Sequence, residues 1–278
     1  MFSSSKKRLA IKVFFLFVLA LIVAFYLFPI FWMLITSFKN RLQAFQIPPV
    51  WVFLPSIKTY KNVMTESSII RAYINSIVVT SISTFFSMLF GSMAAYGLTR
   101  LKIPRRDDLS FFILSTRMFP PIITVIPVYM LFRTMNILDT RLGLILVYIS
   151  FNLGFVVWMM EGFISEIPVE LEEAALIDGC SRLGIFKKII LPLVRPGLTA
   201  TTIFCVIFSW NEYLFAVILT GKAARTMPVK AAATITDRGV NWGDLTAIAA
   251  LISIPILIIG ALVQKHLIRG LTVGALKQ

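Results

Sequence analysis

Charged residues are scarce in this sequence, and their scarcity excludes an ordinary soluble domain. Only 14% of the 278 residues are charged and 58% are hydrophobic, whereas soluble domains average about 25% charged and about 45–50% apolar residues. Lysine and arginine still outnumber acidic residues by 27 to 13, which gives a net charge of +14. The basic residues mostly stand between apolar runs and form no stripe interleaved with base-stacking aromatic residues, so nucleic-acid binding is not expected.

Cysteine and histidine are almost absent. Cys180 stands in a polar stretch, Cys205 lies inside an apolar run, and His266 is the one histidine. Two cysteines so placed do not make a disulfide framework, and neither has the spacing of a metal ligand. The sequence therefore predicts no metal site.

Motifs of nucleotide-binding and catalytic sites are also absent. The phosphate-binding pattern G-x-x-x-x-G-K-[ST] does not occur, because Gly221-Lys222 lacks the upstream glycine and the hydroxyl residue. Neither H-E-x-x-H nor G-x-S-x-G is found. We expect no catalytic residue and no cofactor in this chain, and energy from ATP would have to come from another subunit.

What the sequence does have is a set of long apolar runs. They occupy residues 13–35, 72–98, 109–132, 142–160, 198–220 and 245–264. About 20 residues in a helix cross the hydrocarbon core of a membrane, and lipid-exposed backbone has to satisfy its own hydrogen bonds. The runs therefore predict an all-α polytopic membrane protein with six transmembrane helices. The first run is too long for a signal peptide and is interpreted as a retained span.

The distribution of basic residues favours cytoplasmic termini. With the N-terminus inside, the inner segments hold 15 Lys and Arg residues, the outer segments hold 11, and Arg117 is intramembrane. The predicted organisation is a tail and first span (1–36), an external loop (37–71), a membrane-spanning core (72–268) and a cytoplasmic tail (269–278). The core spans cover about 72–98, 109–132, 142–163, 198–220 and 245–268. The external loop contains several prolines and is expected to be mostly irregular with one short helix.

The segment between the fourth and fifth spans, residues 164–197, is the densest acidic stretch. Pro168 stands where a helix can begin, and the glutamates that follow suit the positive end of a helix dipole. Gly179 is a natural helix stop and Ser181 can cap a second helix. Pro192 and Pro196 then break the chain before the fifth span. A short helix, a bend and a second helix are predicted.

This segment carries a family resemblance. The pattern E-A-A, three residues, G, nine residues, I-x-L-P is complete here and resembles the EAA loop of ABC-importer permeases. The family implies that this loop forms a coupling helix that docks on an ATPase. The residues that the resemblance assigns to ATPase coupling are Glu173, Ala174, Ala175, Asp178, Gly179, Ile189, Leu191 and Pro192.

Further stretches extend the resemblance to the second permease of carbohydrate-uptake systems. They are W-M-L-I-T-S-F-K (32–39), A-A-Y-G-L-T-R (94–100), R-M-F-P-P (117–121), W-N-E-Y (210–213) and G-L-T-V-G-A-L-K (270–277). The family's last residue is often Gly where this chain has Gln278. The family implies a bacterial inner-membrane importer made of a heterodimer of two permeases and two ATPase subunits that bind ATP and Mg²⁺. The resemblance also implies an external solute-binding protein that delivers the sugar or polyol, and membrane lipid around the spans.

Polar residues inside the predicted spans have two interpretations. Arg117, followed by Pro120 and Pro121, either belongs to a translocation path or gate, or pairs with Glu161 or Glu212, or reaches the cytoplasmic surface. The prolines are expected to break or kink the third helix. The other candidates for a path, which are equally explained as hydrogen bonds between helices, are Asn152, Trp210, Asn211 and Glu212.

Two further segments gain a role from the resemblance. The loop 221–244 is similar to the family's loop that reaches toward the binding protein, and its alternative is a solvated loop. The candidate contacts are Lys222, Arg225, Met227, Pro228 and Trp242. The tail 270–278 resembles a segment that can reach the ATPase, and its alternative is a frayed terminus.

Three function classes compete for this sequence. A permease subunit of an ABC importer for a carbohydrate or polyol explains the EAA loop and the missing nucleotide site. Half of a gradient-driven transporter is the alternative, although such proteins commonly show internal repeats and paired intramembrane acids, and none is visible. A membrane enzyme would need a catalytic constellation that the sequence does not contain.

Overall fold

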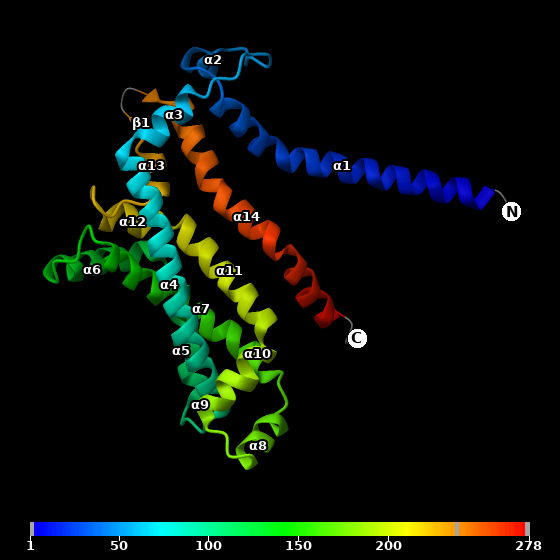
Figure 1. Ribbon diagram of the computed structural model, residues 1–278, viewed down its shortest axis with the longest axis vertical. Coiled ribbons are helices and arrows are strands. Elements are labelled where there is room, and N and C mark those ends of the chain that lie inside the picture. The colour runs from blue at the N-terminus through cyan, green and yellow to red at the C-terminus, as the bar shows by residue number, and fades with distance from the viewer. Residues whose placement is uncertain (1–2, 237–238, 276–278) are drawn as a thin grey trace. The chain divides into compact units, whose positions relative to one another are not determined.

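The protein is described by a computed structural model that covers residues 3–236 and 239–275. Apart from one hairpin of two short strands, the described elements are helices (Figure 1). The helices are α1 (Ser3–Ser37), α2 (Arg41–Phe45), α3 (Lys58–Thr65), α4 (Ser67–Arg100), α5 (Arg106–Met118), α6 (Pro121–Thr134), α7 (Arg141–Ser165), α8 (Glu170–Ile177), α9 (Arg182–Ile185), the π-helix η1 (Phe186–Ile190), α10 (Leu191–Leu193), α11 (Arg195–Asn211), α12 (Leu214–Leu219), α13 (Met227–Ala232) and α14 (Trp242–Ala275). The strands β1 (Ile235–Thr236) and β2 (Gly239–Val240) pair antiparallel.

The predicted helical membrane protein is confirmed at the level of its long apolar helices. Four helices among the described residues are long and apolar enough to cross a membrane, and the number rises to six if each of two bent helix pairs counts as one span. One bent pair is α5 with α6, at 92°. The other joins Arg182–Leu193 to α11, at 81°.

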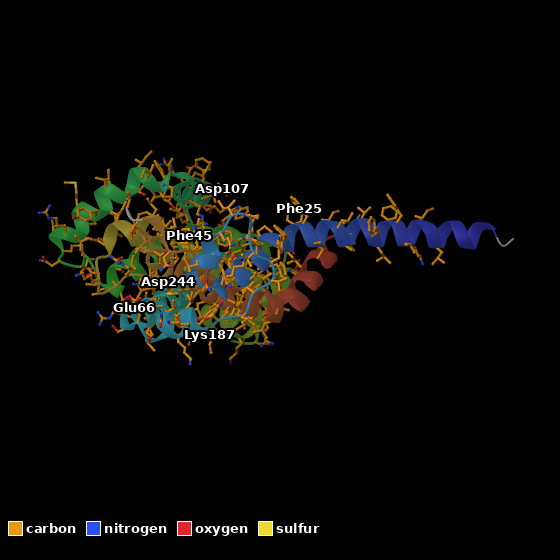
Figure 2. All side chains as sticks on the ribbon, turned by 90° about the horizontal axis from the view of Figure 1, so that it is seen from above. Phe25, Phe45, Glu66, Asp107, Lys187 and Asp244 are labelled. Carbon is orange, nitrogen blue, oxygen red and sulfur yellow. The ribbon has the colours of Figure 1, made fainter. Side chains whose placement is uncertain are left out.

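The chain divides into two compact units. The first consists of Met1–Glu66 and Ala231–Ser253, and the second of Ser67–Lys230 and Ile254–Gln278. In the first unit, apolar side chains project from α1 on every side (Figure 2), and Phe25 is 77% exposed. A helix that is apolar all round requires lipid or a protein partner to cover it.

The second unit is built around α4 and α7. One buried cluster joins these helices to the segment α9–α10, with Val156, Met160 and Ile190 fully buried. A second cluster joins them to α6 and α12, with Val79 and Val125 fully buried. Gly91 of α4 permits close packing, since a Cβ atom there would lie 2.6 Å from Cγ1 of Val156. The two clusters hold the ends of α4 and α7, and the segments that follow these ends carry the candidate sites.

Three sequence predictions about element bounds are corrected. The loop 37–71 contains two short helices, α2 and α3, and α4 already begins at Ser67. The fifth apolar run is not one helix, because α11 ends at Asn211 and α12 begins at Leu214. The helix α14 continues to Ala275, so residues 270–275 of the predicted tail are helical, while residues 276–278 lie outside the described part of the chain.

Candidate functional site

The helix α8 forms the first half of the predicted coupling segment. It begins two residues after Pro168 and carries three glutamates in its first turn. It ends because Gly179 takes a left-handed conformation, with φ +80°. The Gly179 N–H donates to the carbonyl of Leu176 at 3.0 Å, and the Cys180 N–H donates to the carbonyl of Ala175 at 2.9 Å. These two bonds close the end of the helix around a left-handed glycine, so the prediction of a helix stop at Gly179 is confirmed.

The second half turns the chain toward α11. Ser181 caps α9, because its hydroxyl accepts from the Gly184 N–H at 3.2 Å, as predicted. The helix then passes through η1 and α10, and the break falls at Val194, between the two prolines. The predicted break before the fifth span is therefore confirmed, as an 81° bend between Pro192 and Pro196. Ile189 and Leu191 pack against the first buried cluster.

The helix α8 has two different faces. Glu172 and Ala175 are buried, with exposed fractions of 1% and 7%. Glu173 and Ala174 are exposed, and Ile177 is 87% exposed. An exposed face that mixes carboxylate and apolar side chains on a helix of eight residues is suited to contact with another protein.

The buried glutamate of α8 is held by α4. The Nε atom of Arg100 donates to Oε1 of Glu172, and the hydroxyl of Tyr96 donates to Oε2 at 3.0 Å. The Nη2 atom of Arg100 also donates to the carbonyls of Ile164 at 2.9 Å and Ile167 at 2.6 Å. Sequence reasoning missed this cluster. The sequence feature that could have predicted it is the spacing of Glu172 and Ala175. They are three residues apart, which places both on one side of the helix.

Arg117 lies at the end of α5 and has no acidic partner in the described structure. Its Nη1 atom donates to the carbonyl of Phe151 at 2.9 Å, and its guanidinium lies 4.4 Å from the ring centroid of Phe208. Glu161 accepts from Ser110 instead, at 2.7 Å. Pairing of Arg117 with Glu161 or Glu212 is therefore wrong, because aromatic rings and a carbonyl stabilise the cation. The predicted break at Pro120 and Pro121 is confirmed by the bend between α5 and α6.

Glu212 connects α7 to α12. Its carboxylate accepts from the hydroxyl of Tyr148 at 2.9 Å, and from the N–H groups of Phe215 at 2.8 Å and Ala216 at 3.0 Å. An acidic side chain at this place satisfies the free N–H groups of the first turn of α12. Glu212 therefore has a structural role that explains why α11 and α12 are separate helices.

The remaining candidates for a translocation path lie on α7 and at the end of α11. Asn152 is fully buried and donates to the hydroxyl of Ser209 at 2.8 Å. Among the described residues, its Oδ1 atom finds no hydrogen-bond partner. Trp210 is 4% exposed and packs edge-on against Tyr73, whereas Asn211 is exposed and donates to the carbonyl of Ile207. Asn152 and Trp210 thus bridge helices, which is the alternative that the sequence left open.

The loop after α12 is anchored at its start by a carboxylate from the segment between α6 and α7. The carboxylate of Asp139 accepts from the N–H groups of Gly221, Lys222, Ala223 and Ala224. Partial burial raises the pKa of this carboxyl, but the four N–H groups outweigh burial and hold the pKa of Asp139 below its ordinary value. Asp139 therefore holds the first four residues of the loop that the sequence proposes as a binding-protein contact.

The candidate contacts in this loop differ in exposure. Lys222 is exposed and Arg225 and Pro228 are half-buried. Met227 is fully buried, and its N–H donates to the hydroxyl of Ser76 at 2.8 Å, so its side chain does not lie on the surface. Trp242 is 42% exposed and belongs to the other compact unit.

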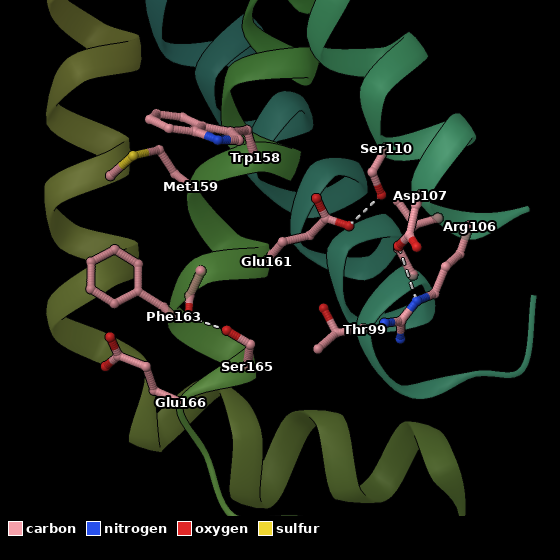
Figure 3. A pocket seen from close by; sticks show the side chains of 12 residues that line it. Thr99, Arg106, Asp107, Ser110, Trp158, Met159, Glu161, Phe163, Ser165 and Glu166 are labelled. Atoms are coloured by element: carbon pink, nitrogen blue, oxygen red, sulfur yellow. Dashed lines mark hydrogen bonds and ion pairs between the residues drawn. The ribbon is translucent and has the colours of Figure 1, made fainter.

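A cavity of about 560 Å³ lies between the C-terminal end of α4, the N-terminal end of α5 and the C-terminal half of α7. Glu161 and Ser110 point toward each other at its wall (Figure 3). Trp158 and Glu166 also line it, and none of its lining residues belongs to the predicted translocation path. In the described part of the chain, no group of three or more His, Cys, Asp or Glu side chains is arranged to hold a metal ion.

Comparison with known proteins gives a family and a fold. Residues 87–273 match the family described as binding-protein-dependent transport system inner membrane component. The trehalose transport system permease protein SugB of Mycobacterium tuberculosis is 36% identical over 263 residues, which cover 92% of this chain and 94% of that protein. The diacetylchitobiose uptake system permease protein DasC of Streptomyces coelicolor is 34% identical over 254 residues, with coverage of 90% and 91%.

A solved structure has the same fold. It is a bacterial ABC transporter involved in the import of the acidic polysaccharide alginate, and it matches with a TM-score of 0.76 at 24% identity. The match covers 95% of this chain and 98% of the other. At this identity the likeness shows the arrangement of the helices.

Proposed function

The chain belongs to the family of binding-protein-dependent transport system inner membrane components, and on that premise we propose that it is the permease subunit of an ABC importer for a carbohydrate or polyol. The observation that carries the proposal is α8, a helix between the fourth and fifth predicted spans that is closed by Gly179 and exposed on one face. Family membership removes the alternative of a gradient-driven half-transporter. The chain is a translocation subunit and no enzyme.

The substrate class is supported by relatives that align over nearly the whole chain. The two relatives named above are called permeases for trehalose and for diacetylchitobiose. Both compounds are neutral oligosaccharides built from hexose rings. A sugar or polyol of this kind is therefore proposed for this chain.

The proposed topology has six spans, with the bent pairs counted as one span each and both termini in the cytoplasm. It is supported by the larger number of Lys and Arg residues, 15 against 11, in the segments assigned to the inside. In this topology α8 faces the cytoplasm. The loop after α12 faces outward, where Lys222 and Arg225 are available to the binding protein.

The proposed mechanism is alternating access. Two separate ATPase subunits bind ATP and Mg²⁺ and contact Glu173, Ala174 and Asp178 on the exposed side of α8. Their closure draws α8 toward the corresponding helix of a second permease chain, and their opening after hydrolysis reverses the movement. Each nucleotide state has to stabilise one orientation of the permease over the other, since a ligand without such a preference shifts nothing. Arg117 and Asn211 are proposed to lie along the path that opens.

The experiment is an uptake assay in cells that lack this chain. Deletion should reduce uptake of one member of a panel of labelled disaccharides, oligosaccharides and polyols at least tenfold, and the wild-type gene should restore it. Gly179→Pro should not restore uptake, because proline cannot adopt φ +80° and removes the N–H that bonds Leu176. Glu173→Lys should also fail, since it reverses an exposed charge of α8.

The control is Gly162→Ala, where the added Cβ atom would meet nothing within 4 Å. Immunoblots of membrane fractions verify that all variants are inserted at equal levels. Normal uptake of every carbohydrate and polyol in the deletion strain, or full rescue by both α8 variants, would contradict the proposal.

A further inference from the structure

Three segments of the second unit meet at the side chain of Arg100. Arg100 is the last residue of α4, and its Nη2 atom donates to the carbonyl of Ile164 in the last turn of α7 and to that of Ile167 just after it. Carbonyls at the end of a helix have no partner within the helix and have to find one elsewhere. The Nε atom of the same guanidinium donates to Glu172 in the first turn of α8. One planar cation therefore binds the end of α7 and the start of α8 together.

Both carboxylate oxygens of Glu172 accept hydrogen bonds from α4. Its two oxygens accept from Arg100 and from the hydroxyl of Tyr96, which lie four residues apart on one face of α4. The side chains of Arg100 and Glu172 are only 8% and 2% exposed. The Tyr96 ring also packs against Phe186 of η1, with 5.2 Å between centroids. The cluster thus touches both halves of the coupling segment.

Apart from Glu172 and Ala175, the side chains of α8 are exposed, so few buried contacts fix α8 to α4 and α7. The helix has eight residues, which is too short for stability on its own. Its side chains that are buried in the described structure are those of Glu172 and Ala175. Ala175 offers one methyl group, so the orientation of α8 relative to α4 and α7 depends on the buried ion pair and its hydrogen bonds.

We propose that Arg100, Glu172 and Tyr96 are positioning residues that make α8, the end of α7 and the end of α4 move as one body. A displacement of α8 is then passed to two spanning helices without loss, instead of being absorbed by bending of residues 166–169. This inference rests on the proposed function, because the displacement comes from the ATPase. It assigns the transmission of movement to Glu172 and the contact with the ATPase to its neighbour Glu173.

The test uses the complete importer, purified from native membrane through a tag on this chain and returned to vesicles with its binding protein. For each variant we would measure the ATPase subunit that remains bound, the rate of ATP hydrolysis, and the solute transported per ATP. The variants are Glu172→Gln, Arg100→Lys and the double change. Tyr96→Phe is the mildest variant, since it removes one oxygen and keeps the ring. Glu170→Gln, an exposed carboxylate in the same first turn, is the matched control.

The expected result is a complex with the wild-type amount of ATPase subunit that still hydrolyses ATP but transports at least fivefold less solute per ATP in the two single variants. The double variant should be no worse than either single one, because both act through one link. Tyr96→Phe should lower the ratio about twofold, and Glu170→Gln should leave it unchanged.

The inference is overturned if all variants keep the wild-type ratio, if Glu170→Gln lowers it equally, or if the ATPase subunit is lost from the complex, which would mean a role in assembly. Should Arg100→Lys fail to insert, Tyr96→Phe decides the matter, because its ring packing is intact. If the wild-type complex contains no ATPase, the proposed function is overturned instead. The two failures are distinguishable because this one occurs without any substitution.

Discussion

Asp139 shows how one side chain can shape a loop that lies far from it along the chain. Its φ of +54° places it in the left-handed region, and its carboxylate accepts from four consecutive N–H groups beginning at Gly221. Successive N–H groups that converge in this way form a concave site for an anion. Here the anion belongs to the protein itself, so the loop is ordered by an internal ligand.

The substitution Asp139→Asn should loosen this loop. The amide side chain keeps one acceptor oxygen, but it presents an NH₂ group to the N–H donors that the second carboxylate oxygen serves. We expect the free energy of unfolding to fall by about 1–2 kcal/mol, the order of one hydrogen bond to a partly exposed carboxylate. The measurement is thermal unfolding in detergent, followed by a thiol-reactive dye that reports exposure of the buried Cys205.

The pH dependence gives a second observable for the same residue. Because the pKa of Asp139 is lower in the folded protein than in the unfolded chain, its stabilising contribution is complete above the unfolded pKa of about 3.9 and is lost as the pH falls toward the folded pKa. Wild type should lose its advantage over Asp139→Asn below about pH 4. An advantage that stays constant from pH 7 to pH 3 would contradict this account.

The sequence predicted that glutamates of the acidic segment matter. It did not predict which of two neighbouring glutamates is buried and which is exposed. Glu173 completes the family motif, yet it is Glu172 that is buried and bonded. The two differ only in the side of α8 on which they lie, which depends on where α4 and α7 end. Arg117 was expected to have an acidic partner, but Glu161 and Glu212 are taken by hydroxyl and N–H groups closer to them.

Two glycines of α7 differ in the space around them: Gly154 lies against α5, whereas Gly162 is open. At Gly154 an added Cβ atom would lie 2.8 Å from the carbonyl oxygen of Ile113 in α5, and backbone cannot move aside as a flexible side chain can. At Gly162 the same atom would meet nothing within 4 Å. The same change, glycine to alanine, can be made at both positions of one helix. The comparison therefore separates the effect of packing from that of helix propensity.

We expect Gly154→Ala to destabilise the protein by about 1–3 kcal/mol through overpacking. Gly162→Ala should be neutral or stabilise it by up to about 1 kcal/mol, because alanine favours the helix more than glycine does. Midpoints of thermal unfolding in the same detergent give the comparison. Equal midpoints for both variants would show that α5 does not pack against α7 as described.

The lengths of the apolar runs predicted where the long helices lie. Prolines predicted only some of the breaks between helices. The bend at Pro120 is marked in the sequence, because the residue before a proline leaves the helical region. The break at Glu212 has no proline or glycine. It arises because this carboxylate binds the first N–H groups of α12, and an acidic residue just before an apolar stretch is the only signal for it.

The whole molecule is a permease whose helices expose many large apolar side chains. The side chains of α1 that the structure describes are almost all exposed and apolar, and α6 exposes Ile122, Ile123 and Ile126. Such surfaces mark contacts with lipid or with another chain. The EAA loop predicts the type of subunit, whereas these exposed apolar faces carry no motif that names their partner.

The most direct test of the account is a photocrosslink from α8 in native membrane. A photoreactive amino acid would replace Ile177, which is 87% exposed on α8, and in a matched sample Val52, which is 92% exposed in the loop assigned to the outside. We predict that position 177 yields an adduct with an ATP-hydrolysing subunit and that position 52 yields none. An importer that still transports its solute while position 177 gives no such adduct, or while position 52 gives it with equal yield, would contradict the assignment of α8 as the coupling helix.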